Sequence, residues 1–142
     1  MRVAVVFFEG KAQNRNKTLN IARSLSEGIE GSGHKVDIID GDRDVNTKLT
    51  IYQYIVVGAA AITTFGGKIS ENVTKFLSNA GVISGKRCFA YAAKGGFRIA
   101  KTLQTLMNAM EHEGMYLKYS EVLTSQEEAK AIGKRLHISQ TE

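Results

Sequence analysis

Five short apolar runs, each followed by a polar loop or a stretch with helical periodicity, constrain the fold of this 142-residue chain more than any other feature. The first run, residues 3–8 (VAVVFF), is apolar throughout and rich in β-branched and aromatic residues, as is typical of a strand buried on both faces. The following helical stretch places Ile21, Leu25 and Ile29 on one side. This alternation predicts parallel strands joined by helices that cover both faces of one sheet.

The predicted elements follow one another along the whole chain. The expected strands are residues 3–8, 36–39, 54–59, 88–92 and 116–122. The expected helices carry apolar stripes over residues 21–29, 69–80, 99–110 and 129–136, and a weak segment at 45–52 leaves room for a short additional helix. Ser125 and Glu128 have the spacing of a capping box at the start of the last helix. Since no internal repeat or linker composition interrupts this order, we expect a single domain over residues 1–142.

The composition is that of a soluble globular domain, with 43% hydrophobic and 23% charged residues. A single cysteine, Cys88, excludes an internal disulfide and lies in an apolar run, so we expect a buried thiol and a cytoplasmic protein. The first apolar run is too short to span a membrane, and it is not followed by the small-residue cleavage site of a signal peptide. We therefore expect no membrane partner.

The loop at residues 9–18 is the strongest candidate for a binding site. It leaves a buried strand and enters a helix, so it offers free backbone amides at the positive end of a helix dipole. Lys11, Arg15 and Lys17 add three cations, and Asn16 and Thr18 add neutral donors. The loop lacks the Gly-Lys-Ser/Thr ending of a nucleotide-cleaving P-loop. This pattern favours binding of a phosphate monoester, and the alternative is a solvated loop that only caps its helix.

The element order and the size of the chain resemble the flavodoxin-like fold. The resemblance implies a three-layer α/β sandwich with a five-stranded parallel sheet of order 2-1-3-4-5. The first loop is similar to the longer loop of flavodoxin-like reductases and iron–sulfur flavoproteins, Gly-Ser-x-Arg-x-x-x-Asn-Thr. Gly10 and Thr18 match that pattern, whereas Gln13 stands at its Arg and Lys17 at its Asn. The cofactor that this resemblance implies is FMN.

The resemblance also implies roles for two further loops. The family's third strand ends in Gly-Ser-Pro-Thr-Tyr-x-Gly, and Phe65 with the adjacent glycines stands in the corresponding loop, without the proline. Phe65 would then flank the flavin ring, or, alternatively, fold back into the core. The loop after the fourth strand would bring Lys94, Gly95 and Gly96 to the pyrimidine edge of the flavin, where a cation or an amide stabilises a reduced, anionic ring. The alternative for Gly95 and Gly96 is a plain tight turn.

The expected cofactor site therefore draws on three loops and on no catalytic side chain. Its residues are Gly10, Lys11, Gln13, Asn14, Arg15, Asn16, Lys17, Thr18, Thr63, Thr64, Phe65, Gly66, Lys94, Gly95 and Gly96. The function that follows is electron transfer or flavin-dependent reduction, which for an enzyme means an FMN-dependent oxidoreductase. The departures in the first two loops support an alternative, a binding or regulatory module that has lost FMN. A third hypothesis is a site for another anion, such as a nucleotide.

Charge placement sharpens the choice of partner. The net charge is +5, and residues 51–100 carry six Lys/Arg against one acidic residue, Glu71. The cations expected at the ligand edge are Lys11, Arg15, Lys17, Lys68, Lys94 and Arg98, against Glu9 and the acidic turn at residues 40–44. Such an edge favours a nicotinamide dinucleotide or an acidic redox partner. The sequence shows no aromatic-rich basic surface, so we do not expect nucleic-acid binding. The three histidines are scattered and predict no metal site. A homodimer is one assembly that the sequence allows.

Overall fold

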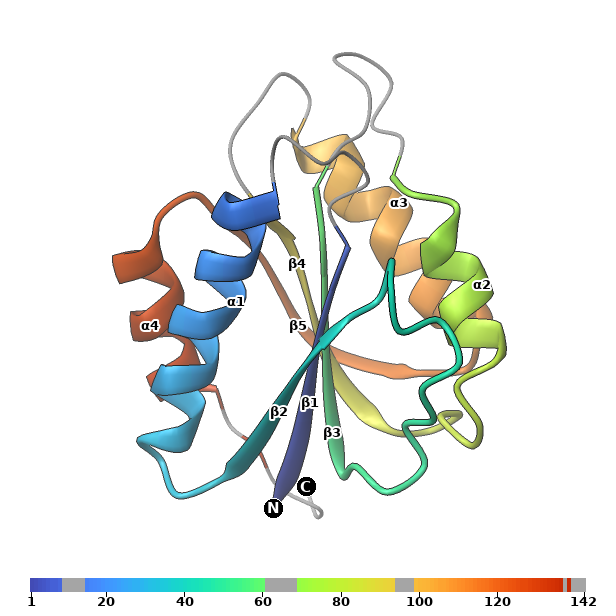
Figure 1. The fold of residues 1–142 in the computed structure, drawn as a ribbon, viewed down its shortest axis with the longest axis horizontal. Helices are drawn as coiled ribbons and strands as arrows, with labels where there is room; N and C mark the ends of the chain where they lie inside the picture. Colours follow the sequence, from blue (N-terminus) through green and yellow to red (C-terminus); the bar gives the residue numbers. More distant parts are fainter. Residues whose placement is uncertain (9–14, 61–68, 94–98, 137, 139–142) are drawn as a thin grey trace.

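In the computed structural model, five parallel strands form one sheet with the order β2-β1-β3-β4-β5, as predicted (Figure 1). The structure describes residues 1–8, 15–60, 69–93, 99–136 and 138, with the backbone alone for residues 15–17. The strands are β1 (Arg2–Phe8), β2 (Lys35–Asp40), β3 (Tyr54–Ala59), β4 (Arg87–Ala93) and β5 (Tyr116–Leu123).

Helices cover both faces of the sheet, so the predicted three-layer sandwich is confirmed (Figure 1). Helices α1 (Arg15–Glu30) and α4 (Gln126–Arg135) lie on one face, and α2 (Asn72–Ser78) and α3 (Ile99–His112) on the other. Two predictions need correction. The segment 45–52 forms turns rather than a helix, and α2 is shorter than the apolar stripe at 69–80 that predicted it.

The core divides into two apolar layers because successive side chains of a strand point to opposite faces. From β1, Val3, Val5 and Phe7 face α1 and α4, whereas Ala4, Val6 and Phe8 face the other layer. All residues of β3 are buried, as expected of a central parallel strand. Cys88 is a fully buried thiol, as expected, and burial raises its pKa to about 12.

The start of α4 shows how closely the predicted cap corresponds to the structure. Ser125 accepts a hydrogen bond from the amide of Glu128, with 3.1 Å between Oγ and N. The Glu128 carboxylate returns to the amide of Thr124, at 2.9 Å, instead of to Ser125. The capping box is therefore confirmed for the serine, and the glutamate satisfies the amide one residue earlier.

Helices α1 and α4 meet at two glycines that allow their backbones to approach. A Cβ atom at Gly28 would lie 2.2 Å from the carbonyl oxygen of Lys130, and a Cβ at Gly133 would lie 2.3 Å from the carbonyl oxygen of Leu25. Backbone atoms cannot rotate away as a flexible side chain can. The separation of the two helices is thus set by the absence of side chains at these two positions.

We predict that Gly133→Ala destabilises the protein by about 1–3 kcal/mol, because the added methyl group forces the two helices apart. Helix propensity alone would change stability in the opposite direction, by about 1 kcal/mol. Urea unfolding measures the difference. Lys134→Ala, at the adjacent exposed position, is the control and is expected to stay within about 0.5 kcal/mol of the wild type. Equal stability of G133A and the wild type would contradict the close contact.

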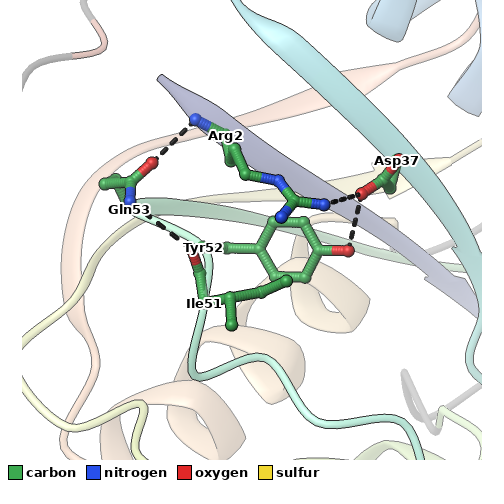
Figure 2. Close-up of polar contacts among 5 residues, drawn as sticks. All are labelled: Arg2, Asp37, Ile51, Tyr52 and Gln53. Carbon is green, nitrogen blue, oxygen red and sulfur yellow. Dashed lines mark hydrogen bonds and ion pairs between the residues drawn. The ribbon is translucent and has the colours of Figure 1, made fainter.

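The amino edge of the sheet carries a polar network that joins the first three strands (Figure 2). The carboxylate of Asp37 in β2 accepts from the Tyr52 hydroxyl at 2.8 Å and from the Arg2 guanidinium at 3.2 Å. That guanidinium also lies over the Tyr52 ring, 5.5 Å from its centroid. Gln53 accepts from the amide of Arg2 at 2.7 Å, and its own amide group donates to the carbonyl of Ile51. The network fixes β1, β2 and the residues that enter β3.

The Lys86 ammonium completes this edge by donating to the carbonyls of Thr50 and Tyr52, at 2.8 and 2.6 Å. Lys86 and Arg87 therefore lie at the edge opposite the expected ligand site. Partial burial lowers the pKa of Lys86. Burial raises the pKa of Tyr52 to about 12, and the hydrogen bond to Asp37 and the charge of that carboxylate act in the same direction.

The raised pKa of Tyr52 makes stability depend on alkaline pH. An unfolded tyrosine ionises near pH 10, whereas folded Tyr52 keeps its proton up to about pH 12. Its contribution is therefore complete below about pH 10 and decreases as the pH rises towards 12, by about 1–2 kcal/mol once solvent screening is included. Burial also raises the pKa values of Tyr54 and Tyr91, so the informative quantity is the difference between variants.

We predict that Tyr52→Phe loses less stability than the wild type between about pH 9 and 12, as measured by urea unfolding at each pH. Tyr116→Phe, at an exposed tyrosine of β5, is the control and should follow the wild-type curve. Parallel curves for Y52F and the wild type would show that the Tyr52 phenol does not titrate as described.

Candidate functional site

Three loops leave the sheet at its carboxyl edge. The strand register places Phe8 of β1 beside Ala59 of β3, and Ala59 beside Ala92 of β4. Because these strands are parallel, the chain segments that follow them start from the same edge. Strand order reverses between β1 and β3, since β2 lies on the outer side of β1. Ligands in open α/β sheets bind at such a reversal. The structure confirms that the loops predicted to bind a ligand follow strands that end at this edge.

Helix α1 begins at this edge and supplies the first element of the site. It starts at Arg15 and runs for 16 residues, so its first turn presents backbone amides that have no partner within the helix. The partial positive charge of the helix dipole adds to them. Thr18 lies in this first turn with only 1% of its surface exposed, which places its side chain against the sheet.

Most of the predicted cofactor residues lie outside the described part of the chain. Arg15, Asn16 and Lys17 are located by their backbone in the first turn of α1, and Thr18 also by its side chain. Outside the described residues lie Gly10, Lys11, Gln13, Asn14, Thr63, Thr64, Phe65, Gly66, Lys94, Gly95 and Gly96. Their roles stay predictions. The structure does establish that their segments leave from strand ends that adjoin one another.

The ends of β3 and β4 carry small side chains, whereas β1 ends in Phe7 and Phe8. β3 ends in Ala59, which Ala60 follows, and β4 ends in Ala92 and Ala93, all of them buried. The amide of Ala60 donates to the carbonyl of Phe8 at 3.0 Å, so the sheet stays paired up to the point where the loops begin. The ends of β3 and β4 therefore provide an apolar floor for the candidate site, built from small side chains.

A polar cluster beside this floor was not predicted from the sequence. Asp42, in the turn after β2, accepts from the Ser70 hydroxyl at 3.0 Å and from the Asn72 side-chain amide at 2.8 Å. The Ser70 hydroxyl also accepts from the Asn72 backbone amide at 3.1 Å. Asp40 holds the turn, since its carboxylate accepts from the amides of Asp42 and Arg43 at 3.0 and 3.3 Å. The cluster ties the start of α2 to the end of β2.

This cluster changes the interpretation of the acidic turn. From the sequence alone, Asp40 and Asp42 count only as negative charge that opposes the cations of the ligand edge. In the structure both carboxylates accept hydrogen bonds that order the turn and the segment entering α2. Gly41 between them is required by packing, because a Cβ there would lie 2.2 Å from the Phe8 ring. Spacing could not reveal partners 28 and 30 residues apart.

Beneath the floor, the ring of Tyr91 in β4 packs on Gly58 in β3. A Cβ at Gly58 would lie 2.0 Å from Cζ of Tyr91, so the glycine is what admits the ring. Tyr91 is fully buried, and its ring stacks on that of Phe89 with 6.0 Å between centroids. The sequence pattern identified Gly58 and Tyr91 only as strand residues and did not predict that they pack together.

Among the residues that the structure describes, no group of three His, Cys, Asp or Glu side chains is arranged to hold a metal ion. None of the helices built from them is long and apolar enough to cross a bilayer.

The similarity of this chain to known proteins lies in its three-dimensional structure. No protein-family model matches, and no curated protein matches. Oxidised flavodoxin 1 from Bacillus cereus is similar over 96% of this chain and all of its own, with a TM-score of 0.70 and 16% identity. Two-electron reduced flavodoxin from Megasphaera elsdenii is similar over 93% of this chain and 96% of its own, with a TM-score of 0.65 and 16% identity.

A WrbA-like flavodoxin from Agrobacterium tumefaciens is similar over 94% of this chain and 93% of its own, with a TM-score of 0.62 and 17% identity. These similarities extend over nearly the full length of both partners, so they concern the whole architecture and not one βαβ unit. Together with the strand order 2-1-3-4-5, they confirm the predicted resemblance: this chain has the flavodoxin-like fold.

Proposed function

We propose that this protein binds FMN at the carboxyl edge of its sheet and acts in electron transfer or flavin-dependent reduction. The observation that carries the proposal is the start of α1, whose first-turn amides lie at the strand-order reversal between β1 and β3. Structures of oxidised and two-electron reduced flavodoxins share this architecture, which supports a redox role for the same edge.

The described residues fit such a cofactor. A phosphate monoester is an acceptor with two negative charges, and free amides at a helix N-terminus are donors with a favourable dipole. The small buried residues that end β3 and β4 provide an apolar support for a flat ring system. The order of the turn at Asp40 and Asp42, and of the entry to α2 at Ser70, holds the rim of the site in place.

In this proposal each loop keeps the role that the sequence analysis gave it. The loop after β1 holds the phosphate, with Lys11, Arg15, Asn16, Lys17 and Thr18 as donors and cations. Phe65 flanks the ring, and Lys94 with Gly95 and Gly96 meets its pyrimidine edge. When bound, FMN supplies the electron or hydride chemistry. The protein binds and orients the ring and tunes its charge, and no side chain needs to act as an acid or base.

The positive charge predicted for this edge extends the proposal to its partner. Flavodoxins that meet basic partners carry acidic residues around the flavin, whereas this chain places Lys and Arg in all three loops. We infer that the electron donor or acceptor is anionic, either a nicotinamide dinucleotide or an acidic protein. Of the acidic turn, the Asp40 carboxylate is offset in part by Arg43, whose Nε lies 3.8 Å from it.

A second candidate is a binding or regulatory module that has lost FMN. The observation in its favour is the first loop, where Gln13 and Lys17 replace the Arg and Asn of the similar reductase pattern. The two candidates differ in one measurement. Titration of FMN into the purified protein should quench flavin fluorescence and shift its visible absorption. A colourless protein that leaves FMN fluorescence unchanged would exclude the first candidate and favour the second.

We predict that Lys17→Glu weakens FMN binding about tenfold or more, because it places a carboxylate in the first turn of α1 beside the phosphate. Fluorescence titration measures the dissociation constant. Lys35→Glu makes the same change in charge at the start of β2, at the opposite edge, and is expected to leave affinity within about twofold of the wild type. If K17E binds FMN as tightly as K35E does, the phosphate does not lie at the start of α1.

A further inference from the structure

We propose that the hydroxyl of Tyr91 is a buried hydrogen-bond donor for the phosphate of the bound ligand. This inference rests on the proposed function, because it requires that a phosphate-bearing ligand occupies the start of α1. Tyr91 is fully buried, and among the residues that the structure describes its hydroxyl has no hydrogen-bond partner. Buried polar groups are almost always paired, so an unpaired hydroxyl in the interior calls for an acceptor that arrives from outside the chain.

The direction of the hydroxyl follows from Gly58. A Cβ at Gly58 would lie 2.0 Å from Cζ of Tyr91 and 2.3 Å from both Cε atoms, so the far end of the ring lies over the glycine. The ring therefore extends from β4 across β3, and the hydroxyl on Cζ points beyond β3 towards β1. The strand register continues this row from Tyr91 through Gly58 to Phe7.

Helix α1 lies on the face of the sheet to which the Tyr91 ring belongs (Figure 1). Phe7 faces the α1 layer and lies one residue before the end of β1. From α1, Ile21 and Ala22 belong to the same apolar layer, and Thr18, in the first turn, is buried as well. The hydroxyl thus lies on the side of the sheet where the α1 amides begin. In this proposal the Tyr91 hydroxyl and the first-turn amides of α1 donate to the same phosphate at the carboxyl edge of the sheet.

The chemistry of a phosphate suits this convergence. A phosphate oxygen only accepts hydrogen bonds, and each oxygen can take more than one donor. Burial raises the pKa of Tyr91, so the phenol keeps its proton and adds no negative charge beside the ligand. A flavin without a phosphate would leave the hydroxyl unpaired. The donor therefore discriminates FMN from riboflavin, in addition to strengthening binding.

The experiment compares Tyr91→Phe with Tyr54→Phe in the full chain. Tyr54 is a second buried tyrosine of the same apolar layer, at the opposite end of the sheet in β3, so it controls for the loss of a core phenol. Fluorescence titration gives the affinities for FMN and riboflavin. Thermal unfolding with and without inorganic phosphate gives the stabilisation by the anion alone.

We expect Y91F to bind FMN about tenfold more weakly than the wild type, with riboflavin affinity unchanged and with less stabilisation by inorganic phosphate. Y54F should match the wild type in its affinity for FMN, in its affinity for riboflavin and in its stabilisation by inorganic phosphate. Without ligand, Y91F should melt about 2–4 °C higher than the wild type, because its unpaired hydroxyl is gone. This combination separates a ligand donor from a residue that merely supports the fold, whose loss would lower the melting temperature and both affinities.

Several results would overturn the inference. Equal FMN affinity of Y91F and the wild type would show that the hydroxyl makes no bond to the phosphate, while the proposed function would stand. Equal losses for FMN and riboflavin would place the effect on the ring instead. If the wild type is stabilised by inorganic phosphate but does not bind FMN, the flavin proposal fails and the phosphate site survives. If neither ligand binds, both proposals fail.

Discussion

Burial of the central strands on both faces is the constraint on which the rest of this structure depends. Every residue of β3 and nearly every residue of β1 and β4 is buried, so their backbone groups must pair within the sheet and their side chains must be covered by helices. Crossover connections, helical except between β2 and β3, make the strands parallel, and parallel strands bring the ends of β1, β3 and β4 to one edge. The position of the candidate site is thus a consequence of the core, and its chemistry depends on which residues the loops carry.

Periodicity predicted most of the fold because the information is local. An unbroken apolar run such as that ending in Phe8, and a helical stripe such as that containing Leu25, each identify an element without reference to the rest of the chain. The errors arose where tertiary contacts decide the outcome. Leu49 and Tyr52 are buried, which gave residues 45–52 an apolar character without a helix, since turns and the bond from Tyr52 to Asp37 place them.

The candidate site was less predictable than the fold, for the same reason. Strand order and loop position located it, but the bonds from Ser70 and Asn72 to Asp42 join segments about 30 residues apart, and no spacing rule connects them. The relation between Tyr91 and Gly58 is likewise a matter of register between two strands. A glycine inside a strand indicates that another group approaches closely, but only the structure shows which group does so.

The two edges of the sheet differ in how their polar groups are paired. At the amino edge Asp37, Tyr52, Arg2 and Lys86 form hydrogen bonds that join the ends of the strands through partners within the chain. At the carboxyl edge α1 begins with amides that have no partner within the helix, and among the described residues the Tyr91 hydroxyl has no hydrogen-bond partner. Unpaired donors in a folded chain lower its stability, and they strengthen binding of an acceptor because no internal bond has to break first. A fold secured at one edge can therefore tolerate donors at the other that only a ligand satisfies.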